Sequence, residues 1–291
     1  MPVILVGLVL LSAFMHAGWN LLVQERRGSE IFLYMTGLVA ALGVGPAIAL
    51  EFLGEPIPAR AWAYLLAGAA FQGAYFLGLS RGYRSGDFTV VYPVARALPV
   101  LLVGVGDLVV GRSPSALGWL GLALVTAGCI LVPLVSLRTI KWSSYYNQST
   151  AWILLTALAT VGYSLTDKEG TSLLEPGLLS ALRYDVFEIG FAFLAYGLIL
   201  KAFRQPVARE RSLLGWLTAG LAGLLLFGAY ALVLWAFQLS PNASYVVALR
   251  QFSIVLGVAA GSLLFREEAP LLRISASAVL VVGIIFIVIG G

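Results

Sequence analysis

Six charged residues stand inside long apolar stretches of this 291-residue sequence: Arg96, Asp107, Arg183, Asp185, Glu188 and Arg250. A guanidinium group suits carboxylate and phosphate ligands, because its planar donors can bind two oxygens together. The depth of Arg96 and Arg250 within apolar segments therefore predicts a site for an anionic group. The competing interpretation pairs these arginines structurally with acids or with carbonyl groups at helix ends.

Asp185 and Glu188 are the candidates for binding a proton. Their spacing of three residues places both on one face of a helix. Neighbouring carboxylates resist being ionised together, which suits a group that takes up and releases a proton. The competing interpretation is a charge-neutralising network that these two acids form with Arg183 and Arg250.

His16, the one histidine, is followed one helical turn later by Trp19 and Asn20. At this spacing the three side chains can share a helix face, and an imidazole beside an amide can bind a polar substrate. The alternative is hydrogen bonding between helices. Further candidates for the lining of a substrate site, with packing or interfacial anchoring as the alternative for the aromatic ones, are Tyr75, Tyr92, Tyr163, Trp235 and Gln251.

The segments that carry these residues are predicted to span a membrane. Apolar residues make up 60% of the chain and charged residues 11%, against about 25% charged in a typical globular domain. This composition excludes soluble globular and disordered proteins. A spanning helix needs about 20 apolar residues, and charges and turns divide the chain into ten such segments: 3–23, 31–50, 61–80, 88–110, 115–137, 151–166, 177–200, two within 212–249 that separate at 240–242, and 274–290.

The basic residues predict the orientation. Of the 18 lysines and arginines, twelve fall in odd-numbered connections between spans and three in even-numbered ones. Cytoplasmic loops carry the excess of basic residues, so the odd-numbered connections are expected in the cytoplasm. Both termini are then expected on the extracytoplasmic side of the cell's inner (plasma) membrane. The role of the basic residues in setting the orientation explains the net charge of +4, which therefore does not indicate binding to nucleic acid. The single cysteine, Cys129, and the lack of Cys/His spacing predict no metal site.

The two halves of the sequence repeat a similar order of features. The segment 10–13 of the first span has a counterpart in 154–157, and Gly-Ala-Tyr at 73–75 recurs at 228–230. Each Gly-Ala-Tyr is followed by a polar turn and a span with an arginine early in it. Since five is odd, consecutive five-span units must enter the membrane from opposite sides. We predict two inverted five-helix repeats, residues 1–140 and 148–291, in one membrane domain, as in many secondary transporters.

Three stretches then carry a family resemblance: His-Ala-Gly-Trp-Asn at 16–20, Gly-Asp-Phe-Thr-Val-Val-Tyr-Pro-Val-Ala-Arg at 86–96, and Tyr-Ser at 163–164 with Asp-Lys at 167–168. With them the chain resembles, over essentially its whole length, the EamA-like branch of the drug/metabolite transporter superfamily. The resemblance implies a carrier of small metabolites that works by alternating access, with export as the expected direction.

We therefore expect an all-α integral membrane protein that transports a small polar or anionic metabolite, such as an amino acid, an organic acid or a phosphonate. The alternative is an integral-membrane enzyme that acts on a lipid or lipid-linked substrate. Neither a His-Glu-x-x-His helix nor a phosphate-binding Gly-x-x-x-x-Gly-Lys loop occurs. We expect no catalytic residue and no cofactor. The expected partners are the substrate, the lipid bilayer and protons as coupling ion, for a monomer or a weak homodimer.

Overall fold

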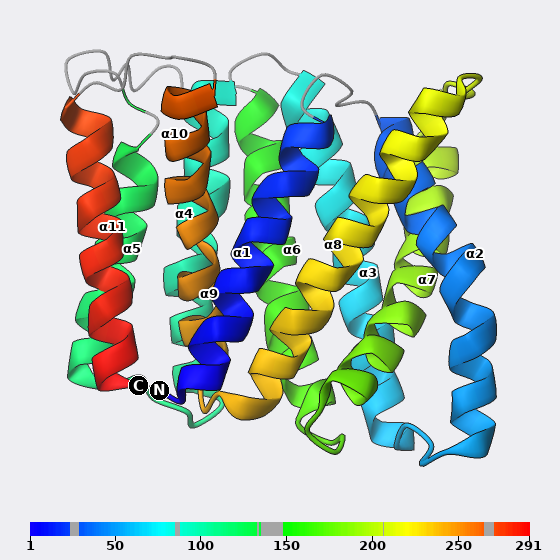
Figure 1. Cartoon of the computed structure of the whole chain (residues 1–291), viewed down its shortest axis with the longest axis horizontal. Coiled ribbons are helices and arrows are strands. Elements are labelled where there is room, and N and C mark those ends of the chain that lie inside the picture. Colours follow the sequence, from blue (N-terminus) through cyan, green and yellow to red (C-terminus); the bar gives the residue numbers. More distant parts are fainter. Residues whose placement is uncertain (24–28, 85–87, 133, 135–147, 206, 265–270) are drawn as a thin grey trace.

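The computed structural model is helical throughout the part of the chain that it describes (Figure 1). It describes residues 1–23, 29–84, 88–132, 134, 148–205, 207–264 and 271–291, without the side chains of residues 29, 83–84, 88–94, 148–149 and 261–264. The helices are α1 Val3–Val23, α2 Ser29–Leu53, α3 Ala59–Arg84, α4 Phe88–Val109, α5 Ala116–Leu131, α6 Gln148–Thr171, α7 Leu178–Ala202, α8 Leu213–Leu239, α9 Ala243–Arg250, α10 Phe252–Leu264 and α11 Leu271–Gly290.

Six of the described helical segments are long and apolar enough to cross a membrane: α1, Glu30–Leu53, Ala59–Gly82, α8, Ala243–Ala260 and α11. The shorter α5 is also apolar. The predicted span 3–23 coincides with α1. The predicted turn at 240–242 is confirmed between α8 and α9, where the Ser240 hydroxyl donates to the Asn242 carbonyl at 2.7 Å.

One predicted boundary was wrong. The sixth span, expected to end at residue 166, continues as α6 to Thr171 and so contains Asp167 and Lys168. At this place a charged residue was interpreted as the end of a span, whereas the helix carries that residue into the protein interior. The span after the turn at 240–242, expected to carry Arg250 inside it, comprises α9 and α10, and Arg250 lies in the last turn of α9.

A break at Gln251 separates α9 from α10. The backbone N–H of Gln251 donates to the Ala248 carbonyl at 3.0 Å, and its side chain donates to the Val247 carbonyl at 3.1 Å. These bonds close the end of α9 and leave Arg250 in its last turn. The carbonyl end of a helix favours a cation, so the break supplies a suitable environment for the buried part of this arginine.

Helices from the two halves of the chain pack against one another. α3 contacts α6 and α7, α1 and α2 contact α8, α5 contacts α11, and α4 contacts α9. Glycines allow close approach: a Cβ at Gly78 of α3 would lie 2.9 Å from the Trp152 carbonyl oxygen of α6. Small residues at such crossings are typical of helix packing in membranes, so the halves form one interleaved bundle.

Both chain termini lie at the same end of this bundle (Figure 1). The amino group of Met1 donates to the carbonyl oxygens of Val288 at 2.9 Å and Gly291 at 3.0 Å. The turn between α8 and α9 lies at this end as well. Deeper in the bundle, the residues predicted to carry the function come together.

Candidate functional site

Two adjoining cavities open between helices of both halves of the chain. Their empty volumes, which include space open to solvent, are about 470 and 630 Å³, and they share four lining residues, His16, Tyr75, Tyr163 and Arg250. The shared lining makes the two cavities parts of one chamber, which we call the central chamber.

Most residues predicted for the site line this chamber: His16, Trp19, Asn20, Tyr75, Arg96, Tyr163, Asp185, Arg250 and Gln251. Glu188 is fully buried beside it, with 0% exposure. Trp235 lines neither cavity and packs against the hydrophobic core. It follows the chamber residue Tyr230 by five positions, about 140° further around the helix. Tyr92 belongs to α4, but its side chain is outside the described residues.

His16 lies between two hydrogen-bond donors. Its Nε2 is 2.8 Å from Nη1 of Arg96, and its Nδ1 is 3.2 Å from the indole N–H of Trp19. Guanidinium and indole nitrogens only donate, and a neutral imidazole has only one acceptor nitrogen. In every tautomer, one of the two contacts therefore sets an imidazole N–H against another donor.

The two deep arginines are held by neighbours in different helices. Nη2 of Arg96 donates to the Ser253 hydroxyl of α10 at 2.7 Å, which ties α4 to the second half of the chain. The guanidinium carbon of Arg250 lies 5.5 Å from the centre of the Tyr230 ring, within cation–π range. Arg250 lines both cavities, one of which it shares with both His16 and Asp185.

The alternative interpretation of Asp185 and Glu188 was a charge-neutralising network that includes Arg183. In the described structure Arg183 instead pairs with another acid. Its Nε lies 3.7 Å from Oε2 of Glu51 in α2. Arg183 and Glu188 are five residues apart on α7, so they occupy different helix faces. The ion pair with Glu51 therefore explains how the charge of Arg183 is balanced without a role for this arginine in the central chamber.

Asp167 adds a third acid beside the two that were predicted. The Tyr230 hydroxyl donates to its Oδ2, and the Gln72 amide donates to Oε1 of Glu188 at 2.8 Å. A Cβ placed on Gly68 would meet both Asp167 Oδ1 and Glu188 Oε1, so these two oxygens face the same small space. We call Asp167, Asp185 and Glu188 the acid cluster.

The sequence interpretation missed Asp167 and Ser253 as site residues. Asp167 was assigned to the polar end of the sixth span, although it follows Tyr163 by four residues and so shares its helix face. That spacing was the available signal. Ser253 carries no such signal, because a lone serine in an apolar helix is common.

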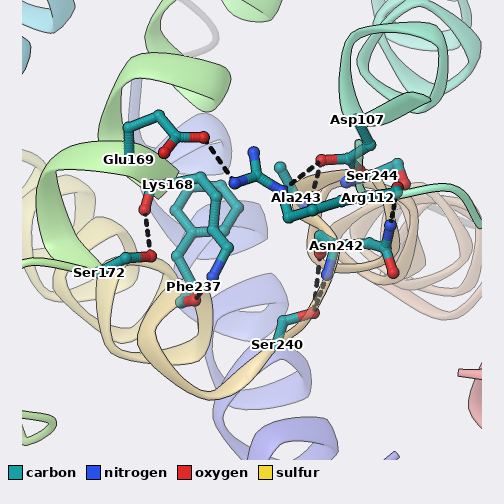
Figure 2. Close-up of polar contacts among 10 residues, drawn as sticks. All are labelled: Asp107, Arg112, Lys168, Glu169, Ser172, Phe237, Ser240, Asn242, Ala243 and Ser244. Atoms are coloured by element: carbon teal, nitrogen blue, oxygen red, sulfur yellow. Dashed lines mark hydrogen bonds and ion pairs between the residues drawn. The ribbon is translucent and has the colours of Figure 1, made fainter. Parts of the chain in front are cut away.

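A second polar network joins the helix ends near the chain termini (Figure 2). Arg112 lies between two acids, with Nη1 2.5 Å from Glu169 of α6 and Nε 3.5 Å from Asp107 of α4. The Asp107 carboxylate also accepts the backbone N–H groups of Ala243 at 3.2 Å and Ser244 at 2.8 Å, at the start of α9. We call this the Arg112 network, and it connects the two halves of the chain.

The chain contains one Gly-x-Ser-x-Gly string, at 78–82, which in hydrolases marks a strand-to-helix turn that exposes a nucleophilic serine. Here the string lies inside α3. The Ser80 hydroxyl donates to the Leu77 carbonyl at 3.0 Å, and Ser80 is 1% exposed. This serine is a buried helix residue without the geometry of a hydrolase nucleophile.

Comparisons with known proteins agree with this architecture. Residues 3–134 match the profile of the EamA-like transporter family. A curated relative from Sinorhizobium sp., named "Uncharacterized transporter in cobO 3'region", is 32% identical over 76 residues, which are 26% of this chain. The match spans only 54% of that relative's length.

One solved structure, described only as "Crystal structure of protein", shares the fold along nearly the whole chain. The superposition has a TM-score of 0.68, covers 97% of this chain and 95% of the other, and pairs residues that are 14% identical. At this identity the likeness concerns the fold alone.

Proposed function

We propose that this chain, whose residues 3–134 match the EamA-like transporter family, belongs to that family and carries a small anionic metabolite across the membrane by alternating access. It is a multi-pass membrane protein. The metabolite we propose is an amino acid, an organic acid or a phosphonate that uses its acidic group to bind in the central chamber.

The contact of His16 with two donors carries the proposal. An anionic oxygen between Arg96 and His16 would accept from Nη1 of the arginine and from an Nε2–H of the imidazole. The other ring nitrogen would then accept the indole N–H of Trp19, and each donor would have an acceptor. Arg250, on the same chamber wall, adds a second positive charge. A negatively charged ligand would therefore supply the acceptor that the His16 ring lacks among its contacts with the described residues.

The packing pattern supports two inverted repeats, 1–140 and 148–291, with ten spans. In this assignment, α1 to α3 correspond to α6 to α8, α4 corresponds to α9 with α10, and α5 corresponds to α11. If each helix is replaced by its counterpart, the contact of α3 with α6 becomes the contact of α8 with α1, and both are observed. In the same way the contact of α3 with α7 becomes that of α8 with α2, and both are observed. The contacts α2 with α7, α4 with α9 and α5 with α11 map onto themselves. Inverted repeats place the substrate between the halves.

The Arg112 network is suited to close the chamber at the end where the termini lie. It fastens α4 to α6 and to the start of α9, elements that belong to different repeats. The ion pair between Arg112 and Glu169 is partly exposed, with 25% exposure for Arg112 and 33% for Glu169, so it can open at small cost, whereas Asp107 is 0% exposed. The distribution of basic residues supports an outside position for this end in the plasma membrane.

Transport into sealed liposomes tests the proposal. The purified full-length protein should move at least one labelled anion from a panel of amino acids, organic acids and phosphonates without ATP. The alternative, an enzyme acting on lipids, predicts no movement of any panel compound but turnover of a lipid substrate in detergent. That outcome would replace the transporter proposal.

A further inference from the structure

The acid cluster is buried among groups that do not neutralise it. Asp167 and Glu188 are 0% exposed and Asp185 is 1% exposed. The titratable, charged or amide groups that face the cluster are Gln72 from α3, Tyr184 from α7, Tyr230 from α8 and Arg250 from α9. Among these groups Arg250 is the only cation, and its charge acts on Asp185. Three acids therefore lie near a single positive charge in the described part of the chain.

Each acid has an oxygen without a hydrogen-bond partner in the described part of the chain: Oδ1 of Asp167, Oδ2 of Asp185 and Oε2 of Glu188. The buried hydroxyl of Tyr184 also has no acceptor there. Unmatched buried polar atoms are costly, and unmatched carboxylate charges more so. The cluster therefore requires a ligand that brings positive charge and a donor.

The surroundings favour a proton over a metal cation. Gln72 and Tyr230 already direct donors at one oxygen each of Glu188 and Asp167. A bound metal would lie beside these donors, whereas hard cations prefer a shell of oxygen acceptors. One proton on either carboxyl instead creates an O–H donor that can bond the facing oxygen beside Gly68.

We propose that Asp167 and Glu188 share a bound proton, and that Asp185 and Arg250 couple this proton to the anion in the central chamber. The coupling rests on the proposed transport function. Protonation lowers the negative charge around Asp185, so Arg250 is held less strongly there and is available to the anion in the chamber. The proton and the anion therefore bind together, and by linkage each raises the affinity for the other.

Infrared difference spectroscopy detects this proton without a known substrate. The full-length protein in liposomes is compared between acidic and alkaline buffer, and the carbonyl stretch of a protonated buried carboxyl is followed. Wild type should show the band, and Glu188→Gln and Asp167→Asn should each lose most of it. Glu51→Gln, which removes a partly buried carboxylate of the Arg183 ion pair, is the matched control and should keep it.

Coupling is tested by adding a probe anion, methylphosphonate or glutarate, to the same samples. The anion that is transported should preserve the wild-type band to higher pH, and Arg250→Gln should abolish this effect. A band that survives in both acid variants would overturn the proton site. A titration that moves when sodium replaces potassium would assign the site to a metal cation instead.

The outcomes also separate this inference from the proposed function. Wild-type anion transport with no titrating band refutes the proton site alone. A band that behaves as expected, in a protein that transports no panel compound, refutes the transport proposal and leaves the proton site standing. Monodisperse elution of each variant in detergent shows that a lost band is not a loss of folding.

Discussion

Replacing Arg96 with glutamine should remove most of the affinity for the anion. In the structure this guanidinium contacts His16 at 2.8 Å and Ser253 at 2.7 Å, which fixes its orientation toward the chamber. Glutamine keeps an amide donor but loses the charge and the planar fork. A hydrogen bond to a charged group contributes about 1.5–3 kcal/mol, which is about a 10- to 150-fold change in affinity.

Thermal unfolding with and without ligand measures this loss. At a ligand concentration ~100 times the wild-type Kd, binding stabilises the folded protein by about 2.7 kcal/mol. If the Kd rises ~100-fold, the same concentration stabilises the variant by only about 0.4 kcal/mol. The ligand-induced rise in Tm should therefore nearly vanish in Arg96→Gln.

The matched control is Arg183→Gln, because Arg183 is also a largely buried arginine within a helix but pairs with Glu51 away from the chamber. Its ligand-induced rise in Tm should equal that of wild type. An unchanged ligand response in Arg96→Gln, or an equal loss in both variants, would refute the assignment of Arg96 to the anion site.

Three further variants test other parts of the structure. His16→Phe should weaken anion binding by about tenfold, measured as Kd, because it removes one donor to the charged group; an unchanged Kd would contradict the role of the imidazole. Arg112→Ala should raise labelling of a Ser244→Cys thiol by about two- to fivefold, since a partly exposed ion-pair network contributes ~0.5–1 kcal/mol, and equal labelling would argue against a closing contact. Gly78→Ala should cost about 1–3 kcal/mol of stability by overpacking, measured against Gly7→Ala, whose Cβ meets nothing within 4 Å; equal Tm values would disprove close packing of α3 on α6.

The sequence predicted the spans well where hydropathy alone determines them. The first span matches α1, and the Ser-Pro-Asn turn separates α8 from α9 as expected. It failed at Asp167, which lies inside a helix, because hydropathy cannot distinguish a charge at a span end from one that faces a polar interior. Helical spacing from a neighbouring aromatic residue is the better criterion there.

Much of the site depends on contacts between residues that are far apart in sequence. Arg96 and Ser253 are 157 positions apart, and Gln72 and Glu188 are 116 apart. Such pairs follow from how the two halves interleave, which periodicity within one helix does not specify. The predicted lining residues on α1, α4, α6 and α9 nevertheless reach one chamber, because each shares a helix face with a neighbouring polar or aromatic residue.

Counterflow with a matched pair of probes tests the central claim most directly. Liposomes that contain the full-length protein and are loaded with an unlabelled carboxylate or phosphonate are given the labelled anion or its neutral amide or ester. The account predicts accumulation of the anion, little accumulation of the neutral analogue, and loss of the difference in Arg96→Gln. Equal accumulation of the anion and its neutral analogue by wild type would contradict a chamber built to bind negative charge.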